Sequence, residues 1–378
     1  MSIQSPLPAD YARISTDECR RRIAERKAQL GGSLCILGHH YQRDEVVEFA
    51  DFTGDSLKLS QLAAAQKEAR HIVFCGVHFM AESADIVSSD EQVVILPHLG
   101  AGCQMADMAD ADGVSVALGE LAELTDERIV PVAYVNSTAA IKAITGRSGG
   151  ACCTSSNVRG VFQWALSPVA DGGAGAGKIF CVPDQHLGRN TAVAMGYAVE
   201  DCVVYDPAQP AGALSADDVA RARFILWKGH CYVHQKFRPE HVRSVRAAQA
   251  GVRVVVHPEC PREVVALADA SGSTEQIIRA VAAGEPGSRW AIGTESNLVN
   301  RLARRHEDRF VRVLSDAPAL CAMMHRIDLP HLLWVLDRLS AGEVVNRVSV
   351  DPATAGDARR ALDRMLAAGA AADLTPGR

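Results

Sequence analysis

Three cysteines have the most distinctive chemistry in this sequence. Cys103, Cys231 and Cys321 each follow a short apolar run, and the chain has neither a CxxC pair nor the Cys/His spacing of a zinc finger. Thiolates from distant segments are typical ligands of an iron–sulfur cluster or another metal. Three protein ligands would leave one iron open as a Lewis acid for a substrate hydroxyl or carboxylate. The alternative is that all three pack as small buried hydrophobes.

The positions of these cysteines favour metal binding over core packing. Cys103 follows the small residues 100–102, and Cys231 lies between His230 and Tyr232. Neither thiol therefore falls inside an apolar run, where a cysteine would be read as part of a core.

The other eight cysteines are interpreted as structural. The total of 11 is odd, so they cannot all pair within one chain, and a reducing cytosol disfavours disulfides. Cys260 is the main rival as a metal ligand because it follows His257 and Glu259. The rest are expected in strands, in an N-terminal helix or in the core: Cys19, Cys35, Cys75, Cys152, Cys153, Cys181 and Cys202.

Several other side chains can move protons. Candidates for general acid or base catalysis are His39, Tyr41, Tyr134, His257 and Glu259. Glu259 is the most prominent carboxylate, because it directly follows an apolar strand-like run and a His-Pro pair. The alternative for each histidine is a structural hydrogen bond at the end of a strand.

Three hydroxyl residues occur where helices are expected to start: Ser56, Ser155 and Thr274. A helix N-terminus offers free backbone N–H groups and partial positive charge, so it can hold a carboxylate or a phosphate. Simple N-capping is the alternative for each residue. Their matching positions favour substrate binding.

These residues recur within a repeated pattern of elements. Segments beginning at Ser33, Ile129 and Val252 each open with an apolar strand, a polar cluster, an Ala-rich helix and a hydroxyl-bearing turn before a second helix. His39 precedes Ser56 by as many residues as His257 precedes Thr274. Another strand and helix follow in each case, and a further strand leads to one of the three cysteines.

Alternating strands and helices predict an α/β protein of three similar αβα three-layer domains with short parallel sheets. Ligand groups of such sheets lie at the carboxyl ends of the strands, where the polar clusters occur. We expect the domains to surround a central cleft with pseudo-threefold symmetry. The expected domains are 1–107, completed by 324–378, then 108–236 and 237–323, and the last residues are expected to be frayed.

Composition excludes several other classes of protein. The 378 residues carry a formal net charge of −6, which gives no electrostatic reason to bind nucleic acid or an anionic membrane. No signal peptide or apolar stretch of about 18 residues is evident, so we expect a cytoplasmic protein without a membrane span. No strand-linked GxGxxG, GxxxxGK[ST] or GxSxG motif occurs, which argues against a nucleotide enzyme or a serine hydrolase.

Eight strings, in order along the chain, resemble the quinolinate synthase family: GHHYQRDEV, DFTGDSLKL, YVNS, CTSSN, PDQHLGRN, GHCYVH, HPEC and GSTEQII. The resemblance implies three αβα domains in a triangle around a [4Fe–4S] cluster with one open iron, held by Cys103, Cys231 and Cys321. It places Tyr41 near the reacting carbons. It assigns substrate binding to His39, Ser56, Tyr134, Val135, Asn136, Ser155, His257, Pro258, Glu259 and Thr274.

The activity implied by the resemblance is condensation of iminosuccinate with dihydroxyacetone phosphate to give quinolinate, phosphate and water, a step toward NAD. It also implies functional coupling to the aspartate enzyme that makes iminosuccinate. Glu259 and Tyr41 are the expected proton shuttles, and His39 and His257 are expected to position carboxylates or the phosphate. A short insertion at 145–151 leaves open whether Ser155 or Ser156 contacts substrate.

Three alternatives remain open from sequence. One is a different cluster-bearing hydro-lyase that acts on another hydroxy acid. The second is an iron–sulfur sensor, although no basic patch or helix-turn-helix signal supports it. The third is a zinc-bound structural protein.

Overall fold

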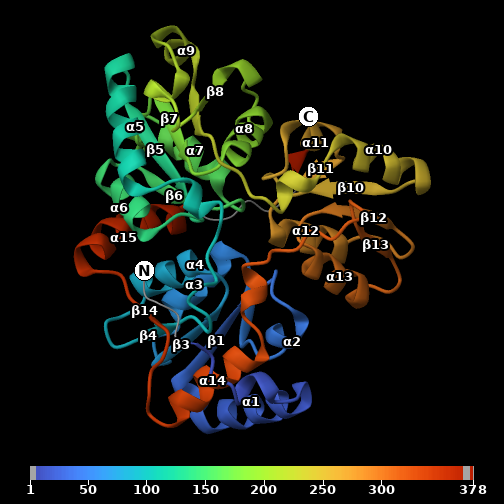
Figure 1. The fold of residues 1–378 in the computed structure, drawn as a ribbon. Coiled ribbons are helices and arrows are strands. Elements are labelled where there is room, and N and C mark those ends of the chain that lie inside the picture. The colour runs from blue at the N-terminus through green and yellow to red at the C-terminus, as the bar shows by residue number, and fades with distance from the viewer. Residues whose placement is uncertain (1–5, 369–374, 378) are drawn as a thin grey trace. The chain divides into compact units, whose positions relative to one another are not determined.

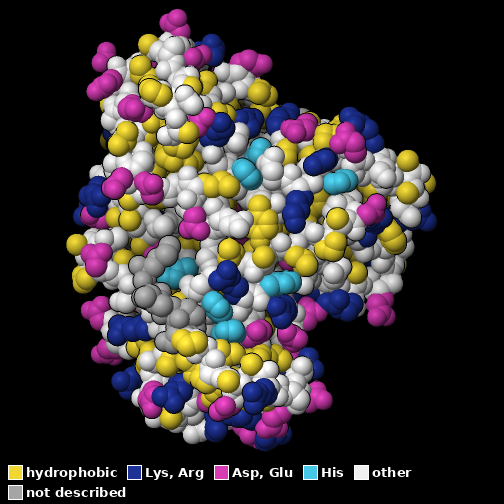
Figure 2. All heavy atoms as spheres, viewed as in Figure 1, with side chains coloured by type: hydrophobic (Ala, Val, Ile, Leu, Met, Phe, Trp, Pro, Cys, Tyr) yellow, Lys and Arg dark blue, Asp and Glu magenta, His cyan; other side chains and the backbone are white. Residues whose placement is uncertain are grey.

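The computed structural model describes residues 6–368 and 375–377. The chain divides into two compact units, described separately below. The first consists of Met1–Cys103 and Cys321–Pro352, and the second of Gln104–Leu320 and Ala353–Arg378. On the face shown in Figure 2, basic and acidic side chains are interspersed over the surface of both.

The first unit is built on a five-stranded sheet in the order β14-β4-β3-β1-β2. Strand β1, which lies between β3 and β2, is buried at every position, as expected for a parallel strand covered on both faces. The strands are β1 (Leu34–His39), β2 (Phe52–Gly54), β3 (His71–Cys75), β4 (Val93–Ile95) and β14 (Arg347–Val348), of which only β14 runs antiparallel. The helices are α1 (Thr16–Leu30), α2 (Asp44–Val47), α3 (Ser56–Ala65), α4 (His78–Val87) and α14 (Leu329–Ser340).

Two layers of helices cover this sheet. Helices α3 and α4 pack together, and α1 packs on α14 (Figure 1). The second pair is fixed by Asp337, which accepts a hydrogen bond from the Tyr11 hydroxyl at 2.9 Å and pairs with Arg26 Nε at 2.7 Å. Cys19 is buried on α1, as expected.

The second unit contains two sheets. The first has the order β6-β5-β7-β9-β8 and is entirely parallel. Its strands are β5 (Ile129–Tyr134), β6 (Ala151–Cys153), β7 (Lys178–Val182), β8 (Cys202–Tyr205) and β9 (Phe224–Trp227). Its helices are α5 (Ala111–Leu124), α6 (Ala139–Arg147), α7 (Val158–Leu166), α8 (Gln185–Ala194) and α9 (Ala216–Arg221).

The other sheet of this unit has the order β13-β12-β10-β11-β15, with only β15 antiparallel. Its strands are β10 (Arg253–Val256), β11 (Ala270–Ser271), β12 (Arg289–Gly293), β13 (Phe310–Val313) and β15 (Thr375–Pro376). Its helices are α10 (Pro239–Ala248), α11 (Arg262–Leu267), α12 (Thr274–Ala282) and α13 (Ser296–Arg305).

All three sheets share one core topology. Each places the second strand of its repeat beside the first, then the third and the fourth, as in β2-β1-β3-β4, β6-β5-β7-β9 and β11-β10-β12-β13. The sheet that contains β5 adds β8 and α9 before its last strand. The predicted α/β class with three similar layers is confirmed. The pseudo-threefold arrangement and the three domain boundaries stay predictions.

The C-terminal segment departs from expectation. The segment 324–378 was expected to complete the first domain. Its residues up to Pro352 do lie in the first unit, but all of helix α15 (Pro352–Ala367) except its first residue lies in the second unit. The Asn157 side-chain amide donates to the Met365 carbonyl at 2.8 Å, and a Cβ at Gly146 would lie 2.0 Å from the Asp357 carbonyl oxygen. The helix therefore packs closely on α6 and on the start of α7.

The end of the chain also differs in part from the expected frayed tail. Residues 369–374 and 378 lie outside the described residues, but β15 pairs with β11. No helix within residues 6–368 and 375–377 is long and apolar enough to cross a membrane.

Candidate active site

A histidine lies at the end of a strand in each unit, and in both the ring accepts the same kind of backbone hydrogen bond. His39 is the last residue of β1, and its Nδ1 accepts the N–H of Tyr41 at 3.1 Å. His257 directly follows β10, and its Nδ1 accepts the N–H of Glu259 at 3.3 Å. An accepting Nδ1 places the proton of a neutral imidazole on Nε2. Each histidine therefore presents Nε2–H as a donor.

In the second unit, Glu259 lies in a buried cluster with two histidines. Its Oε2 is 2.7 Å from His234 Nδ1 and 3.8 Å from His257 Nδ1. The rings of His234 and His257 stack with their centroids 4.4 Å apart. His234 Nε2 is 3.1 Å from the Thr294 hydroxyl, and Tyr134 hydrogen-bonds Glu259. The sequence-predicted Tyr134, His257 and Glu259 are thus brought together.

Electrostatics set the charge of this cluster. Burial alone would raise the pKa of Glu259, but His257, His234 and the hydrogen bonds from His234 and Tyr134 outweigh it and lower that pKa to about 2. Burial and the nearby His234 lower the pKa of His257 to about 3. At neutral pH, Glu259 is ionised and His257 is neutral. Glu259 can therefore accept a proton, and His257 can donate a hydrogen bond without carrying charge.

A second buried carboxyl, Asp184, has a raised pKa where that of Glu259 is lowered. Asp184 caps α8 by accepting the Leu187 N–H at 2.5 Å, while its other oxygen, Oδ2, has no hydrogen-bond partner. Burial and the negative charge of Glu259 raise the pKa of Asp184 well above its usual range. Paired carboxyls whose pKa values are pushed apart are typical of acid–base sites.

Sequence reasoning did not single out His234 and Asp184. His234 follows Cys231 by three residues in GHCYVH, and Asp184 lies in PDQHLGRN. Both strings were noted for the resemblance they carry. A search for histidines and carboxyls after strands β7 and β9 would have found these residues as well.

The adjacent residues Ser155 and Ser156 have different surroundings. Ser155 Oγ lies 3.2 Å from His257 Nε2, whereas Ser156 is buried and its N–H donates to the Thr154 hydroxyl. The structure therefore brings Ser155 to the histidine cluster. Its role in substrate binding stays a prediction.

The capping alternative is wrong for Ser56 and Thr274. The N-caps of α3 and α12 are Asp55 and Ser273, which accept the N–H of the third residue beyond each cap. Ser56 and Thr274 are instead the first residues of their helices.

Asn136 and Pro258 lie at the ends of the strands beside this cluster. Asn136 Oδ1 is buried without a hydrogen-bond partner, and such a buried acceptor favours a bound polar ligand. The Pro258 carbonyl accepts the Asn190 side-chain amide at 2.8 Å. The backbone of Val135 is fixed by its N–H bond to the Cys153 carbonyl at 2.8 Å.

The three candidate ligand cysteines occupy equivalent positions in local structure. A 3₁₀ helix begins three residues after each cysteine, and an α-helix begins eight residues after it. The 3₁₀ helices are η3 (Ala106–Met108), η7 (His234–Lys236) and η8 (Met324–Arg326), and the α-helices are α5, α10 and α14. Cys103, Cys231 and Cys321 are all partly exposed.

Most of the remaining cysteines are core thiols, as expected. Cys260 is fully buried and donates to the Gly293 carbonyl at 3.5 Å, which disfavours it as a metal ligand. Burial raises the pKa of the Cys75 and Cys152 thiols to about 12. Cys202, at the start of the edge strand β8, is half-buried.

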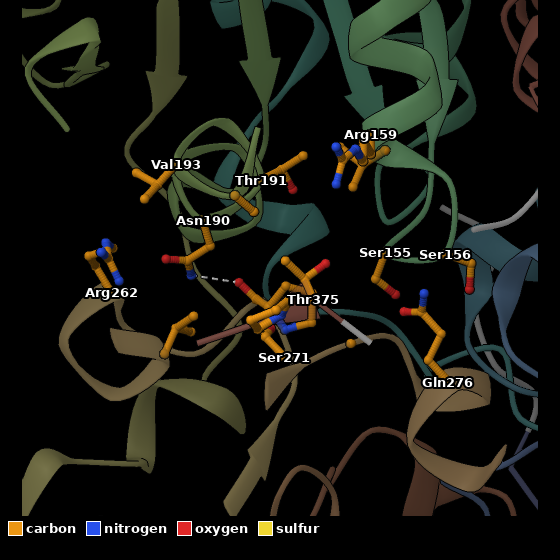
Figure 3. A pocket seen from close by; sticks show the side chains of 16 residues that line it. Ser155, Ser156, Arg159, Asn190, Thr191, Val193, Arg262, Ser271, Gln276 and Thr375 are labelled. Atoms are coloured by element: carbon orange, nitrogen blue, oxygen red, sulfur yellow. Dashed lines mark hydrogen bonds between the residues drawn. The ribbon is translucent and has the colours of Figure 1, made fainter. Parts of the chain in front are cut away.

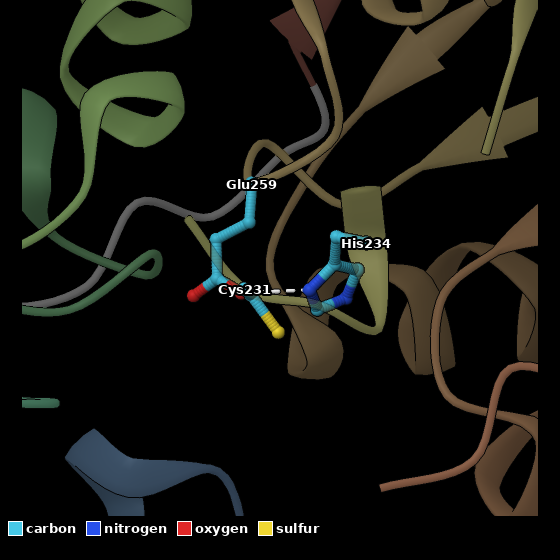
Figure 4. Close-up of side chains that lie close together, drawn as sticks. All are labelled: Cys231, His234 and Glu259. Atoms are coloured by element: carbon cyan, nitrogen blue, oxygen red, sulfur yellow. Dashed lines mark ion pairs between the residues drawn. The ribbon is translucent and has the colours of Figure 1, made fainter. Parts of the chain in front are cut away.

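One of the three cysteines joins the acid–histidine cluster. Ligand atoms of Cys231, His234 and Glu259 all lie within 4.8 Å of one another (Figure 4). Sulfur, imidazole and carboxylate donors in this combination suit zinc or iron. Cys103 and Cys321 belong to the first unit with His39, Tyr41 and Ser56, where the His39 and Tyr41 rings meet edge to face at 4.7 Å. Convergence of all three thiols on one centre stays a prediction.

Comparisons with known proteins agree with these features. Residues 21–367 match the family model described as quinolinate synthetase A protein. The chain is 52% identical over 362 residues to a quinolinate synthase of Nocardioides sp., covering 95% of this chain and 92% of that protein. It is 52% identical to that of Streptomyces coelicolor, covering 95% and 91%, and 50% identical to that of Bacillus velezensis, covering 95% and 96%. This chain therefore belongs to the quinolinate synthetase A family.

Proposed function

We propose that this chain condenses iminosuccinate with dihydroxyacetone phosphate to give quinolinate, phosphate and water, as a step of NAD biosynthesis. The observation that carries the proposal is the buried cluster in which ionised Glu259 pairs with His234 beside Cys231. The family and its relatives support the quinolinate synthase activity. Coupling to the aspartate enzyme that makes iminosuccinate follows from the same reaction.

Each side chain has a role that its surroundings permit. Glu259 takes a substrate proton, because it is ionised at neutral pH, and its lowered pKa means that it returns this proton readily. His257 donates from Nε2 to a carboxylate, with Ser155 on the same side. In the first unit, His39 is oriented in the same way, and Tyr41 serves as the second proton shuttle. The remaining substrate contacts are assigned to Ser56, Tyr134, Val135, Asn136, Pro258 and Thr274.

The cofactor that we propose is a [4Fe–4S] cluster held by Cys103, Cys231 and Cys321. Thiolates are the donors that iron–sulfur clusters take, and these three thiols are partly exposed at equivalent positions of the repeat. When bound, the cluster supplies an open iron that acts as a Lewis acid toward a substrate hydroxyl. Partly exposed cysteine ligands are compatible with a reducing compartment, and we assign the protein to the cytoplasm on that ground.

The test is anaerobic purification followed by iron and sulfide analysis and a quinolinate assay with both substrates. We expect about four iron and four sulfide per chain and quinolinate as product. Iron without sulfide would indicate a single ion at the Cys231–His234–Glu259 group instead. A fully loaded cluster with no quinolinate would reject the proposed reaction and favour another hydro-lyase.

A further inference from the structure

A cavity in the second unit lies beside the Glu259 cluster without belonging to it. It is enclosed by the N-terminal part of α7, by α8 and α11, and by the paired strands β11 and β15 (Figure 3). Ser155 and Pro258 form the wall that it shares with the candidate active site. Ser155 Oγ lies 3.2 Å from His257 Nε2, so the cavity is directly behind that pair.

The lining carries positive charge. Arg159 and Arg262 both line the cavity, and no Asp or Glu does so among the described residues. Within the part of the chain that the structure describes, neither guanidinium makes an ion pair, and Arg262 Nε is buried without a hydrogen-bond partner. Such arginines favour an anion, because a guanidinium binds carboxylate or phosphate through parallel hydrogen bonds.

Two further polar atoms in the lining lack partners. Asn190 and Ser271 are each only 6% exposed, and Asn190 Oδ1 and Ser271 Oγ have no hydrogen-bond partner. The Asn190 amide nitrogen is bound to the Pro258 carbonyl, which directs Oδ1 toward the side of the cavity where Arg262 lies (Figure 3). Buried polar atoms of this kind are costly unless a ligand or water satisfies them. Oδ1 needs a donor, which a hydroxyl of the ligand or a water molecule bound with it can supply.

The helix ends at the cavity and the volume of the cavity further restrict the kind of ligand that it can bind. Helices α7 and α12, of nine residues each, present their N-terminal turns to the cavity, and such turns attract anions. The cavity measures about 60 Å³, room for about four water molecules. One phosphate group fits this space, and a nucleotide does not.

We propose that this cavity binds phosphate, either as the inorganic ion or as the end of a triose phosphate. Arg159 and Arg262 neutralise its charge. Asn190 accepts the hydroxyl of inorganic hydrogen phosphate, whereas for a triose phosphate, whose phosphate dianion has no P–OH, the donor to Asn190 is a water molecule. The source of the phosphate, as substrate or product, rests on the proposed function. Binding itself does not, because it needs only the residues that line the cavity.

The experiment is a titration of the anaerobically purified full chain with inorganic phosphate, followed by calorimetry or ³¹P line broadening. We expect saturable binding that weakens about tenfold for each arginine replaced in Arg159→Gln and Arg262→Gln. Arg243→Gln on α10 is the matched control, because this side chain is 66% exposed and pairs with Glu240 away from the cavity. It should leave the affinity unchanged.

Two outcomes overturn the proposal: no saturable binding by the unmodified chain, or equal affinity in the Arg159→Gln/Arg262→Gln double variant. Succinate that binds as tightly as phosphate at this site would also overturn the assigned class. Glycerol 3-phosphate distinguishes the sources, since tighter binding than phosphate identifies a triose phosphate and weaker binding identifies the free ion. Quinolinate formation is measured separately, so failure of the proposed reaction would leave the binding result standing.

Discussion

The loops after β1 and β10 use the same backbone frame for different chemistry. In both, a strand-end histidine accepts the N–H two residues ahead on Nδ1, so that Nε2–H is presented as a donor. The residue that supplies this N–H is Tyr41 in one loop and Glu259 in the other. The first carries a phenol beside the His39 ring, and the second a carboxylate paired with His234. The two loops thus share the same kind of histidine donor, but each places a different acid–base side chain beside it.

Removing the negative charge of Glu259, in the loop after β10, should cause the largest loss of turnover. In Glu259→Gln the side chain keeps its size but can no longer accept a proton, so we expect turnover to fall by about 10²–10⁴-fold. The measurement is the initial rate of quinolinate formation at matched iron and sulfide content. The cluster content should be unchanged, and near-normal turnover would reject Glu259 as a proton acceptor.

The corresponding change in the first loop should be smaller. Tyr41→Phe removes one hydroxyl but keeps the ring against His39, and we expect a loss of about 10²-fold in turnover with the histidine still oriented. Tyr197→Phe is a matched control, because Tyr197 packs against Phe224 in the second unit. If Tyr41→Phe were as active as the control, the first loop would serve only to position substrate.

The comparison also shows how far sequence reasoning reaches. The strand ends at His39, Tyr134 and His257 were predictable because apolar runs mark buried parallel strands, whose carboxyl ends gather polar groups. His234 was not, since its pairing with Glu259 joins two loops that are not adjacent in sequence. The raised pKa of Asp184 was equally hidden, because burial rather than local sequence causes it.

The packing of the C-terminal segment could not be predicted for a different reason. The amphipathic pattern of α15 specifies that one face is buried, but it does not say against which sheet. The contact is decided by shape, since Gly146 allows the Asp357 backbone to approach closely. Strand β15 is only two residues long, too short for a periodicity to predict.

Stability should fall in acid, and His257 should contribute part of that fall. Its pKa falls from an ordinary 6.5 to about 3 on folding. The unfolded chain therefore binds the proton first, and stability is lost as pH drops below about 6.5. Glu259, with its pKa lowered from 4.5 to about 2, adds a loss only at lower pH. Between about pH 6.5 and 4.5, His257 should contribute a slope of about 1.4 kcal/mol per pH unit.

The measurement is the urea midpoint, converted to a free energy of unfolding, at several pH values in this window. His257→Gln should remove its share of the slope. His186→Gln is the matched control, because burial also lowers the pKa of His186, to about 4, and this variant should flatten the slope while sparing catalysis. An unaltered slope in His257→Gln would mean that the histidine is not neutral in the folded protein.

The smallest effect is expected at the hydroxyl that faces His257. Ser155→Ala removes the oxygen 3.2 Å from His257 Nε2, and the cost of one hydrogen bond corresponds to about a tenfold change. We expect this loss in KM rather than in kcat, because the serine orients a bound group and moves no proton. Ser156→Ala is the natural comparison, since Ser156 is buried and lies one residue away. Equal effects of the two changes on KM would show that the Ser155–His257 contact is structural. The loop after β10 would then hold its histidine through a side-chain contact, which would be a further difference from the loop after β1.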